Sequence, residues 1–166
     1  MRFPKLFISA LTSCVFAGAS GSAMAEGCGD GVLQGERFDG TLRISDETSC
    51  TIIGSTIGGD IRITNVANVL LINNRVDGEI QVNGNASTGT ANVIENTVFG
   101  GELVVRDYET ANVIGNETLN NQLGNIEVIS NISAFVQQNI SARNLICENT
   151  DTDASYNVAV KQEKCE

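Results

Sequence analysis

Short stretches in which apolar and polar residues alternate recur along the chain from residue 38 onwards. Five stretches share one pattern and a sixth follows it more loosely, with central apolar residues at Leu42, Ile61, Ile80, Leu103, Ile126 and Leu145. These centres are 19, 19, 23, 23 and 19 positions apart. Alternation with a period of two is typical of a β-strand that buries one face, and a repeat of about 20 residues indicates a solenoid.

A second strand-like segment precedes the later copies of this pattern, and an amide residue follows it within a few positions. The segments are Val69–Ile72, Asn92–Ile94, Asn112–Ile114 and Ala134–Val136, and the amide residues are Asn74, Asn96, Asn116 and Gln138. Gly and Asn are frequent between segments, where both residues readily adopt the left-handed backbone of tight corners. Helical periodicity is absent.

We therefore predict an all-β fold, a small right-handed parallel β-helix (solenoid) of about six to seven coils. Successive coils would stack at about 4.8 Å, with apolar side chains inside and corner asparagines hydrogen-bonded between coils. A β-sandwich of short strands is the alternative, because it also explains the alternation. It does not explain the regular positions of Gly and Asn.

Residues 1–25 have the pattern of a secretory signal peptide. Arg2 and Lys5 precede a short apolar run, and an A-x-A cleavage site ends at Ala25. We expect cleavage after Ala25, export to the periplasm or the extracellular medium, and a single β-helix domain over residues 26–166.

Two other interpretations of the N-terminus remain open. The sequence Leu11-Thr12-Ser13-Cys14 resembles a lipoprotein box, which would leave a lipid-anchored Cys14 at the start of the exported chain. The apolar run would otherwise be a buried N-terminal helix.

The exported chain would keep four cysteines, Cys28, Cys50, Cys147 and Cys165. An even number in an exported protein favours disulfides over free thiols. The first two cysteines are 22 residues apart and the last two are 18 apart, which is about one coil in each case. We predict the disulfides Cys28–Cys50 and Cys147–Cys165, which would join adjacent coils and cap both ends of the solenoid.

The repeat units resemble a group of bacterial secreted repeat proteins whose units read approximately N-T-V-x-G-N-L-x-V. The resemblance spans about residues 28–165, and it implies a parallel β-helix and a secreted protein but no activity. The two nearest copies and the segment that resembles the closing module of the group are Asn74–Val82, Asn96–Val105 and Asn144–Asn149. The chain departs from the pattern at Asn116–Gly124, where extra residues predict a looped-out corner.

Charge and composition exclude several classes of function. The chain has 10 Lys and Arg against 20 Asp and Glu, and it has no His. Removal of residues 1–25 would take two basic residues and no acidic one, so the exported chain would be still more acidic. Nucleic acids and anionic membranes are bound through Lys and Arg, so neither is an expected partner. Without His, Ser–His and Cys–His nucleophile pairs and imidazole zinc sites are excluded.

Stacking in register would place three carboxylates, Asp60, Glu79 and Glu102, about 5 Å apart in one outward column. Like charges at this spacing raise carboxylate pKa values or attract a cation, and oxygen ligands favour Ca²⁺. The alternative is a solvated acidic face that Arg62 partly neutralises. A shift of one residue in the register would remove the column. We predict no resident cofactor and retain Ca²⁺ at this column as the candidate to test.

The same column would also fit an enzyme that cleaves polysaccharides, with Arg62 or Arg43 beside the acids. Few coils, the lack of long loops, the acidic charge and the scarcity of aromatic residues argue against it. We therefore expect no enzymatic activity and predict a secreted structural or surface-interaction solenoid, with a cell-surface or extracellular polysaccharide as its candidate partner. A Ca²⁺-assisted carbohydrate-binding or polysaccharide-cleaving module is the alternative.

Overall fold

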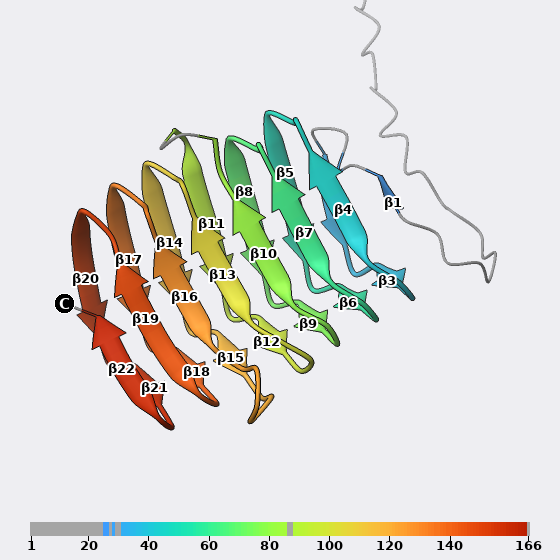
Figure 1. Cartoon of the computed structure of the whole chain (residues 1–166). Helices are drawn as coiled ribbons and strands as arrows, with labels where there is room; N and C mark the ends of the chain where they lie inside the picture. The colour runs from blue at the N-terminus through green and yellow to red at the C-terminus, as the bar shows by residue number, and fades with distance from the viewer. Residues whose placement is uncertain (1–24, 27, 29–30, 86–87, 166) are drawn as a thin grey trace, which may run out of the picture.

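A computed structural model describes residues 25–26, 28, 31–85 and 88–165, which form a parallel β-solenoid of seven coils (Figure 1). The described part of the chain contains 22 strands and no helix. The coils wind in a right-handed sense from the N-terminal to the C-terminal end, as Figure 1 shows. The predicted parallel β-helix is therefore confirmed, and the β-sandwich is not formed. Except for Ala25, the predicted signal peptide and Cys14 lie outside the described residues.

Each coil contributes one strand to each of three parallel sheets, which we name A, B and C, and β1 adds an eighth strand to sheet A. Sheet A consists of β1(Ala25–Glu26), β4(Leu42–Ser45), β7(Ile61–Thr64), β10(Ile80–Asn83), β13(Leu103–Arg106), β16(Ile126–Ile129), β19(Asn144–Glu148) and β22(Gln162–Cys165). Sheet B consists of β2(Val32–Gln34), β5(Ser49–Ile53), β8(Asn68–Ile72), β11(Thr90–Ile94), β14(Thr110–Ile114), β17(Ser133–Gln137) and β20(Asp151–Ser155). Sheet C consists of β3(Arg37–Phe38), β6(Thr56–Ile57), β9(Arg75–Val76), β12(Thr97–Val98), β15(Glu117–Thr118), β18(Ile140–Ser141) and β21(Val158–Ala159).

The register of sheet A is the one that the alternating pattern predicts. The six central apolar residues pair in sequence as Leu42, Ile61, Ile80, Leu103, Ile126 and Leu145. All six side chains are completely buried. Like residues thus stack on like through the core, and a shift of one residue would turn each of them to solvent.

Asparagines at the corner between sheets B and C form a buried ladder that runs through the coils. Each side-chain amide donates to the side-chain oxygen of the next member at 2.9–3.1 Å, in the order Asn74, Asn96, Asn116, Asn139 and Asn157. Three of the four predicted amide residues belong to the ladder. The fourth, Gln138, does not: it occupies the left-handed corner position with φ 56°, and its neighbour Asn139 faces inward.

Most corners contain two to four residues. Two corners are longer, one between sheets C and A and one between sheets A and B. The looped-out corner predicted near Asn116–Gly124 is confirmed, because residues 119–125 separate β15 from β16. Residues 84–89 separate β10 from β11. The ring of Tyr108, one coil further on, packs against Gly84, and its hydroxyl donates to the Val66 carbonyl oxygen two coils back at 2.9 Å. Tyr108 therefore fills the corner at the point where this loop leaves the stack.

Both predicted disulfides are present, one near each end of the solenoid. The Cα–Cα distances are 5.4 Å for Cys28–Cys50 and 4.5 Å for Cys147–Cys165. Cys147 and Cys165 are register partners in β19 and β22, so the second disulfide joins the last two coils directly. Two disulfides are compatible with a periplasmic or extracellular location.

Candidate functional site

The three carboxylates of the predicted column lie where sheet C turns into sheet A. Asp60, Glu79 and Glu102 each precede a strand of sheet A, and the backbone bonds Ile61 N–Glu79 O (2.9 Å) and Ile80 N–Glu102 O (2.9 Å) place them in successive coils. The predicted register of this column is therefore correct. The neighbouring column is correct as well, since Arg43 pairs with Arg62 and Arg62 pairs with Gln81.

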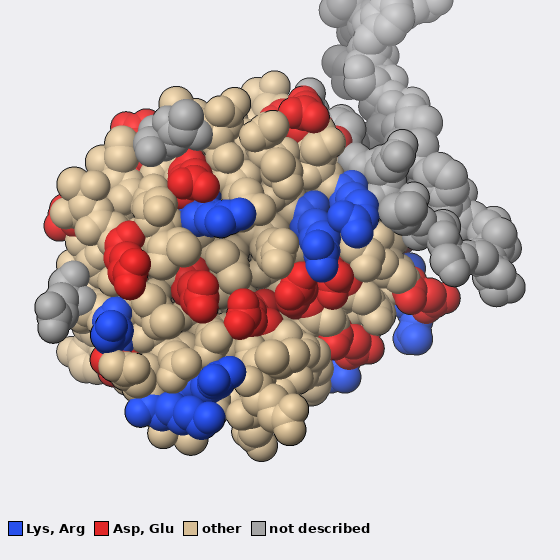
Figure 2. Space-filling view, viewed as in Figure 1, with Lys and Arg blue, Asp and Glu red and all other residues tan. Residues whose placement is uncertain are grey.

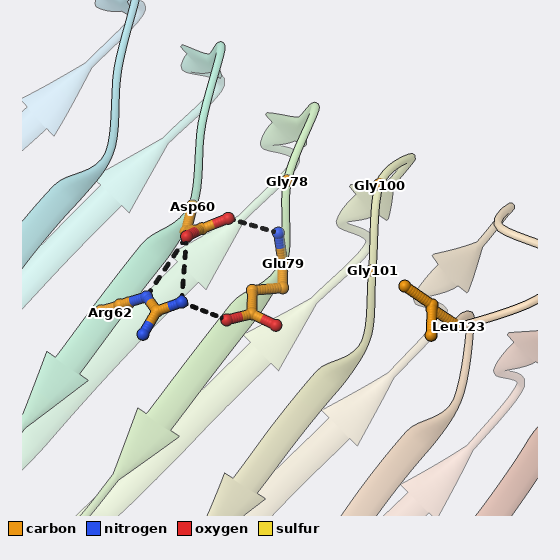
Figure 3. Close-up of a pocket in the computed structure, with 7 residues that line it drawn as sticks. All are labelled: Asp60, Arg62, Gly78, Glu79, Gly100, Gly101 and Leu123. Carbon is orange, nitrogen blue, oxygen red and sulfur yellow. Dashed lines mark hydrogen bonds and ion pairs between the residues drawn. The ribbon is translucent and has the colours of Figure 1, made fainter. Parts of the chain in front are cut away.

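Arg62 bridges the first two carboxylates of the column (Figure 3). Its Nε donates to Asp60 Oδ2 at 3.2 Å, and its Nη2 donates to Glu79 Oε1 at 2.6 Å. Asp60 Oδ1 also accepts from the Glu79 backbone N–H at 3.1 Å. These side chains are only 24–37% exposed, so the ion pairs are partly shielded from solvent. This arrangement matches the interpretation in which Arg62 partly neutralises the column.

Gly78 allows this arrangement, because a Cβ atom at residue 78 would collide with the Asp60 carboxylate. A side chain there would push Asp60 away from both Arg62 and the Glu79 backbone. The glycine that precedes Glu79 in the repeat therefore has a packing reason.

Glu102 is held by a different group. The Asn125 side-chain amide donates to Glu102 Oε1 at 2.8 Å, and the Asn144 amide in turn donates to Asn125 Oδ1 at 3.1 Å. A further carboxylate, Glu127, lies near Glu102 on β16, the next strand of sheet A. Burial, then the charges of Glu102 and Glu148, raise the pKa of the Glu127 carboxyl above its ordinary value, against the lowering effect of a hydrogen bond from Asn125.

A shallow hollow of about 280 Å³ lies beside the Arg62 bridge. Asp60, Arg62 and Glu79 line one side, the glycines at 78, 100 and 101 form its floor, and Leu123 lines the other side (Figure 3). Leu123 comes from the long corner at residues 119–125, a wall that the repeat pattern does not predict. The hollow is open to solvent, and its charged side chains are already paired with each other.

The carboxylate column does not form a closed metal cage. Within the described residues, the group of three Cys, Asp or Glu side chains whose ligand atoms lie within 4.8 Å of one another is Cys28, Glu47 and Cys50. The sulfur atoms of this group are joined in a disulfide, which withdraws them as thiolate ligands. Ca²⁺ binding at Asp60, Glu79 and Glu102 stays a prediction, and a bound ion would compete with Arg62 for the first two carboxylates.

The outer face of sheet B is a second candidate site, which the repeat pattern does not predict. From β2 to β17, every outward side chain of this sheet is uncharged, whereas sheet A and the corners carry many charged side chains (Figure 2). One outward column contains Ile53, Ile72, Ile94 and Ile114. Beside it, the Asn112 amide donates to Asn92 Oδ1 at 2.8 Å. Charged residues return to this face only at Asp151 and Asp153, in the last strand β20.

Comparisons with known proteins found no matching family model, no matching curated protein and no matching solved structure. In the described part of the chain, no helix is long and apolar enough to cross a membrane.

Proposed function

We propose that this protein is a secreted, non-enzymatic β-solenoid that binds a neutral cell-surface or extracellular polysaccharide along the outer face of sheet B. The observation that carries the proposal is the uncharged character of this face in a chain with twice as many acidic as basic residues. A parallel sheet in stacked coils also supplies a flat surface on which identical groups repeat at about 4.8 Å.

The side chains of this face suit a neutral sugar polymer. Hydroxyl and amide groups of Thr90, Asn92, Thr110 and Asn112 can exchange hydrogen bonds with sugar hydroxyls. The adjoining isoleucine column offers an apolar surface to sugar C–H groups. Binding to this face desolvates no charged side chain, so the cost that ionic groups impose on a broad interface is avoided.

The hydrogen bonds of the three carboxylates support a non-enzymatic function. Asp60 and Glu79 are both bound to Arg62, and Glu102 accepts from Asn125. The hollow beside them is shallow and has one apolar wall residue, Leu123. A cleavage reaction needs an acid and a base that face a bound substrate, and these groups face one another.

Co-sedimentation with an insoluble neutral β-glucan, and with polysaccharide purified from the envelope of the producing cell, tests the proposal. We expect binding to at least one neutral polymer and an affinity at least 10-fold lower for Asn112→Asp and for Ile94→Asp. Thr97→Asp adds the same charge to the outer face of sheet C and should leave binding unchanged. No binding to either polymer, or equal loss in all three variants, would contradict the proposal.

The Ca²⁺-assisted carbohydrate-binding or polysaccharide-cleaving module is the second candidate, and the hydrogen bonding of Glu102 favours it. Glu102 accepts a hydrogen bond from the Asn125 amide, whereas Asp60 and Glu79 are held by Arg62. Titration with Ca²⁺, or with Tb³⁺ as a luminescent probe, tests it. Tight binding that Glu79→Gln or Glu102→Gln abolishes, and that the exposed control Glu109→Gln preserves, would support this candidate over the first.

A further inference from the structure

Sheet C changes character along the solenoid. In the first coils its outer face is charged, with the pairs Arg37–Asp39 (3.3 Å) and Arg75–Asp77 (3.1 Å). In the last two coils the corresponding outward residues are the apolar Ile140 and Val158, which follow Glu117 in the same column. At the lower rim of Figure 2, red and blue side chains lie over the first coils, whereas tan and blue cover the corner that follows β15 and β18.

Five exposed aliphatic side chains form this surface, which we name the C-terminal apolar patch. They are Leu119 (41% exposed), Leu123 (52%), Ile140 (47%), Val158 (57%) and Val160 (72%). Their positions are contiguous, because Ile140 pairs with Val158 in adjacent strands. The backbone N–H groups of residues 119, 142 and 160 each donate to the preceding coil, which stacks Leu119, Ala142 and Val160 at one corner.

Leu123 lies at the border between the patch and the hollow beside Arg62, because its side chain is directed toward Gly100 and Gly101 (Figure 3). The Gly124 carbonyl oxygen accepts from the Arg143 backbone N–H at 3.2 Å, and the Arg143 Nη1 donates to the Gln122 carbonyl oxygen at 2.6 Å. The loop is therefore fastened against the corner that contains Ala142. Together the five side chains expose on the order of 450 Å² of apolar surface, which is the size of the largest patch on a typical monomer, and such a patch is often functional.

We infer that the C-terminal apolar patch is the interface of a two-fold symmetric dimer of this chain. In a two-fold symmetric dimer the same patch of each subunit forms the interface, so the apolar surface of one subunit packs against the apolar surface of the other. Two such patches with their rims would bury roughly 1,000–1,200 Å², at the lower limit of stable specific interfaces. Interfaces of this size belong to weak, transient complexes, so a reversible dimer is expected.

Charge also favours a second copy at this place. The net charge of −10 makes two copies repel each other over most approaches. The patch is bordered by the cationic groups Arg143 and Lys161, which stack through a 2.8 Å backbone bond, and by Glu117, which precedes Ile140 in the same outward column. Two copies that meet here bring few carboxylates together. The dimer would form whether or not sheet B binds a polysaccharide.

Sedimentation equilibrium of the exported protein with intact disulfides, from about 1 μM to 1 mM, tests the inference. We expect a monomer–dimer equilibrium whose dissociation constant rises at least 10-fold in Ile140→Asp and in Val160→Asp. Thr97→Asp lies two coils away in the same outward column as Ile140 and should leave the constant unchanged. Circular dichroism establishes whether each variant is folded. If one variant fails to fold, the other still tests the patch.

Three results would overturn the inference. They are a monomer throughout the concentration range, a dimer that both patch variants preserve, and a monomer that instead co-sediments with phosphatidylglycerol vesicles through the patch. The last result would assign the patch to a lipid surface, with Arg143 and Lys161 as its cationic border.

Discussion

At the scale of single residues, the buried asparagine ladder is the feature that fixes the corners between sheets B and C. The Asn116 side chain accepts from the backbone N–H and the amide of Asn96, and its own amide donates to Asn139 and to the Val93 carbonyl oxygen at 2.7 Å. Every hydrogen-bonding group of this buried amide thus has a partner. Such a network is stabilising while it is complete and costly when one member is lost.

Asn116→Ala should lower the free energy of unfolding by about 2–4 kcal/mol, because it leaves buried donors of Asn96 and the Val93 carbonyl without partners. Asn112→Ala is the matched control, since Asn112 belongs to the neighbouring outward ladder and is only half-buried. The control should lose less than about 1 kcal/mol. Urea unfolding of both variants measures the difference, and equal losses would show that the inner ladder contributes no more than the outer one.

The raised pKa of Glu127 predicts a pH dependence of stability. The folded state binds this proton more tightly than the unfolded state, so the contribution of Glu127 to stability is greatest at low pH and is lost as the pH rises through the raised pKa. At pH 7, Glu127→Gln should therefore stabilise the protein slightly, by up to about 0.5 kcal/mol because the group is partly exposed. The gain should vanish below about pH 4. Urea unfolding at pH 4 and pH 7 measures it, and destabilisation at pH 7 would be the opposite result.

At the scale of strands and corners, the sequence predicts the regular parts well. The period-two alternation predicts the register of sheet A, because only one register places every apolar side chain on the core face. The acidic column follows from that register. The pattern cannot distinguish the two amides Gln138 and Asn139, since either residue suits a corner. The strands of sheet C have two residues each, too few for alternation to detect.

The parts of the candidate sites that the sequence misses depend on side-chain directions and loop paths. Arg62 reaches both Asp60 and Glu79 because of its side-chain torsions, which spacing does not specify. The C-terminal apolar patch is hidden in the segment Val158-Ala159-Val160, where hydrophobicity favours burying both valines. The register instead turns the smaller Ala159 toward the core, beneath the buried Ser141.

The buried hydrogen bond of Tyr108, beside the long corner at residues 84–89, contributes to the stability of the fold. Burial raises the pKa of the Tyr108 hydroxyl, which keeps it neutral as the donor to the Val66 carbonyl oxygen. Tyr108→Phe should lower the free energy of unfolding by about 1–3 kcal/mol, because that carbonyl is left buried without its partner. Tyr156→Phe, at a side chain that is 84% exposed, is the control and should have almost no effect. Thermal unfolding followed by circular dichroism distinguishes the two.

At the scale of the whole molecule, the seven coils are closed at their ends in two ways. One disulfide at each end joins cysteines that are about one coil apart in the sequence. Each disulfide is expected to contribute on the order of 3 kcal/mol to stability by restricting the unfolded chain. The last coil also presents small or polar residues at its inward positions, among them Thr152, Ala154 and Ala159. The core thus ends without an apolar surface on which another coil would stack, which limits end-to-end aggregation.

Mass spectrometry of tryptic peptides from the exported protein, without reduction, tests the coil-by-coil winding most directly. Arg37 and Arg43 separate Cys28 from Cys50, and Lys161 and Lys164 separate Cys147 from Cys165, so each cysteine lies in its own peptide. We expect cross-linked peptides for Cys28–Cys50 and for Cys147–Cys165, and reduction should separate each of them into its two component peptides. A Cys28–Cys165 or a Cys50–Cys147 link would contradict it, because those residues lie at opposite ends of the solenoid.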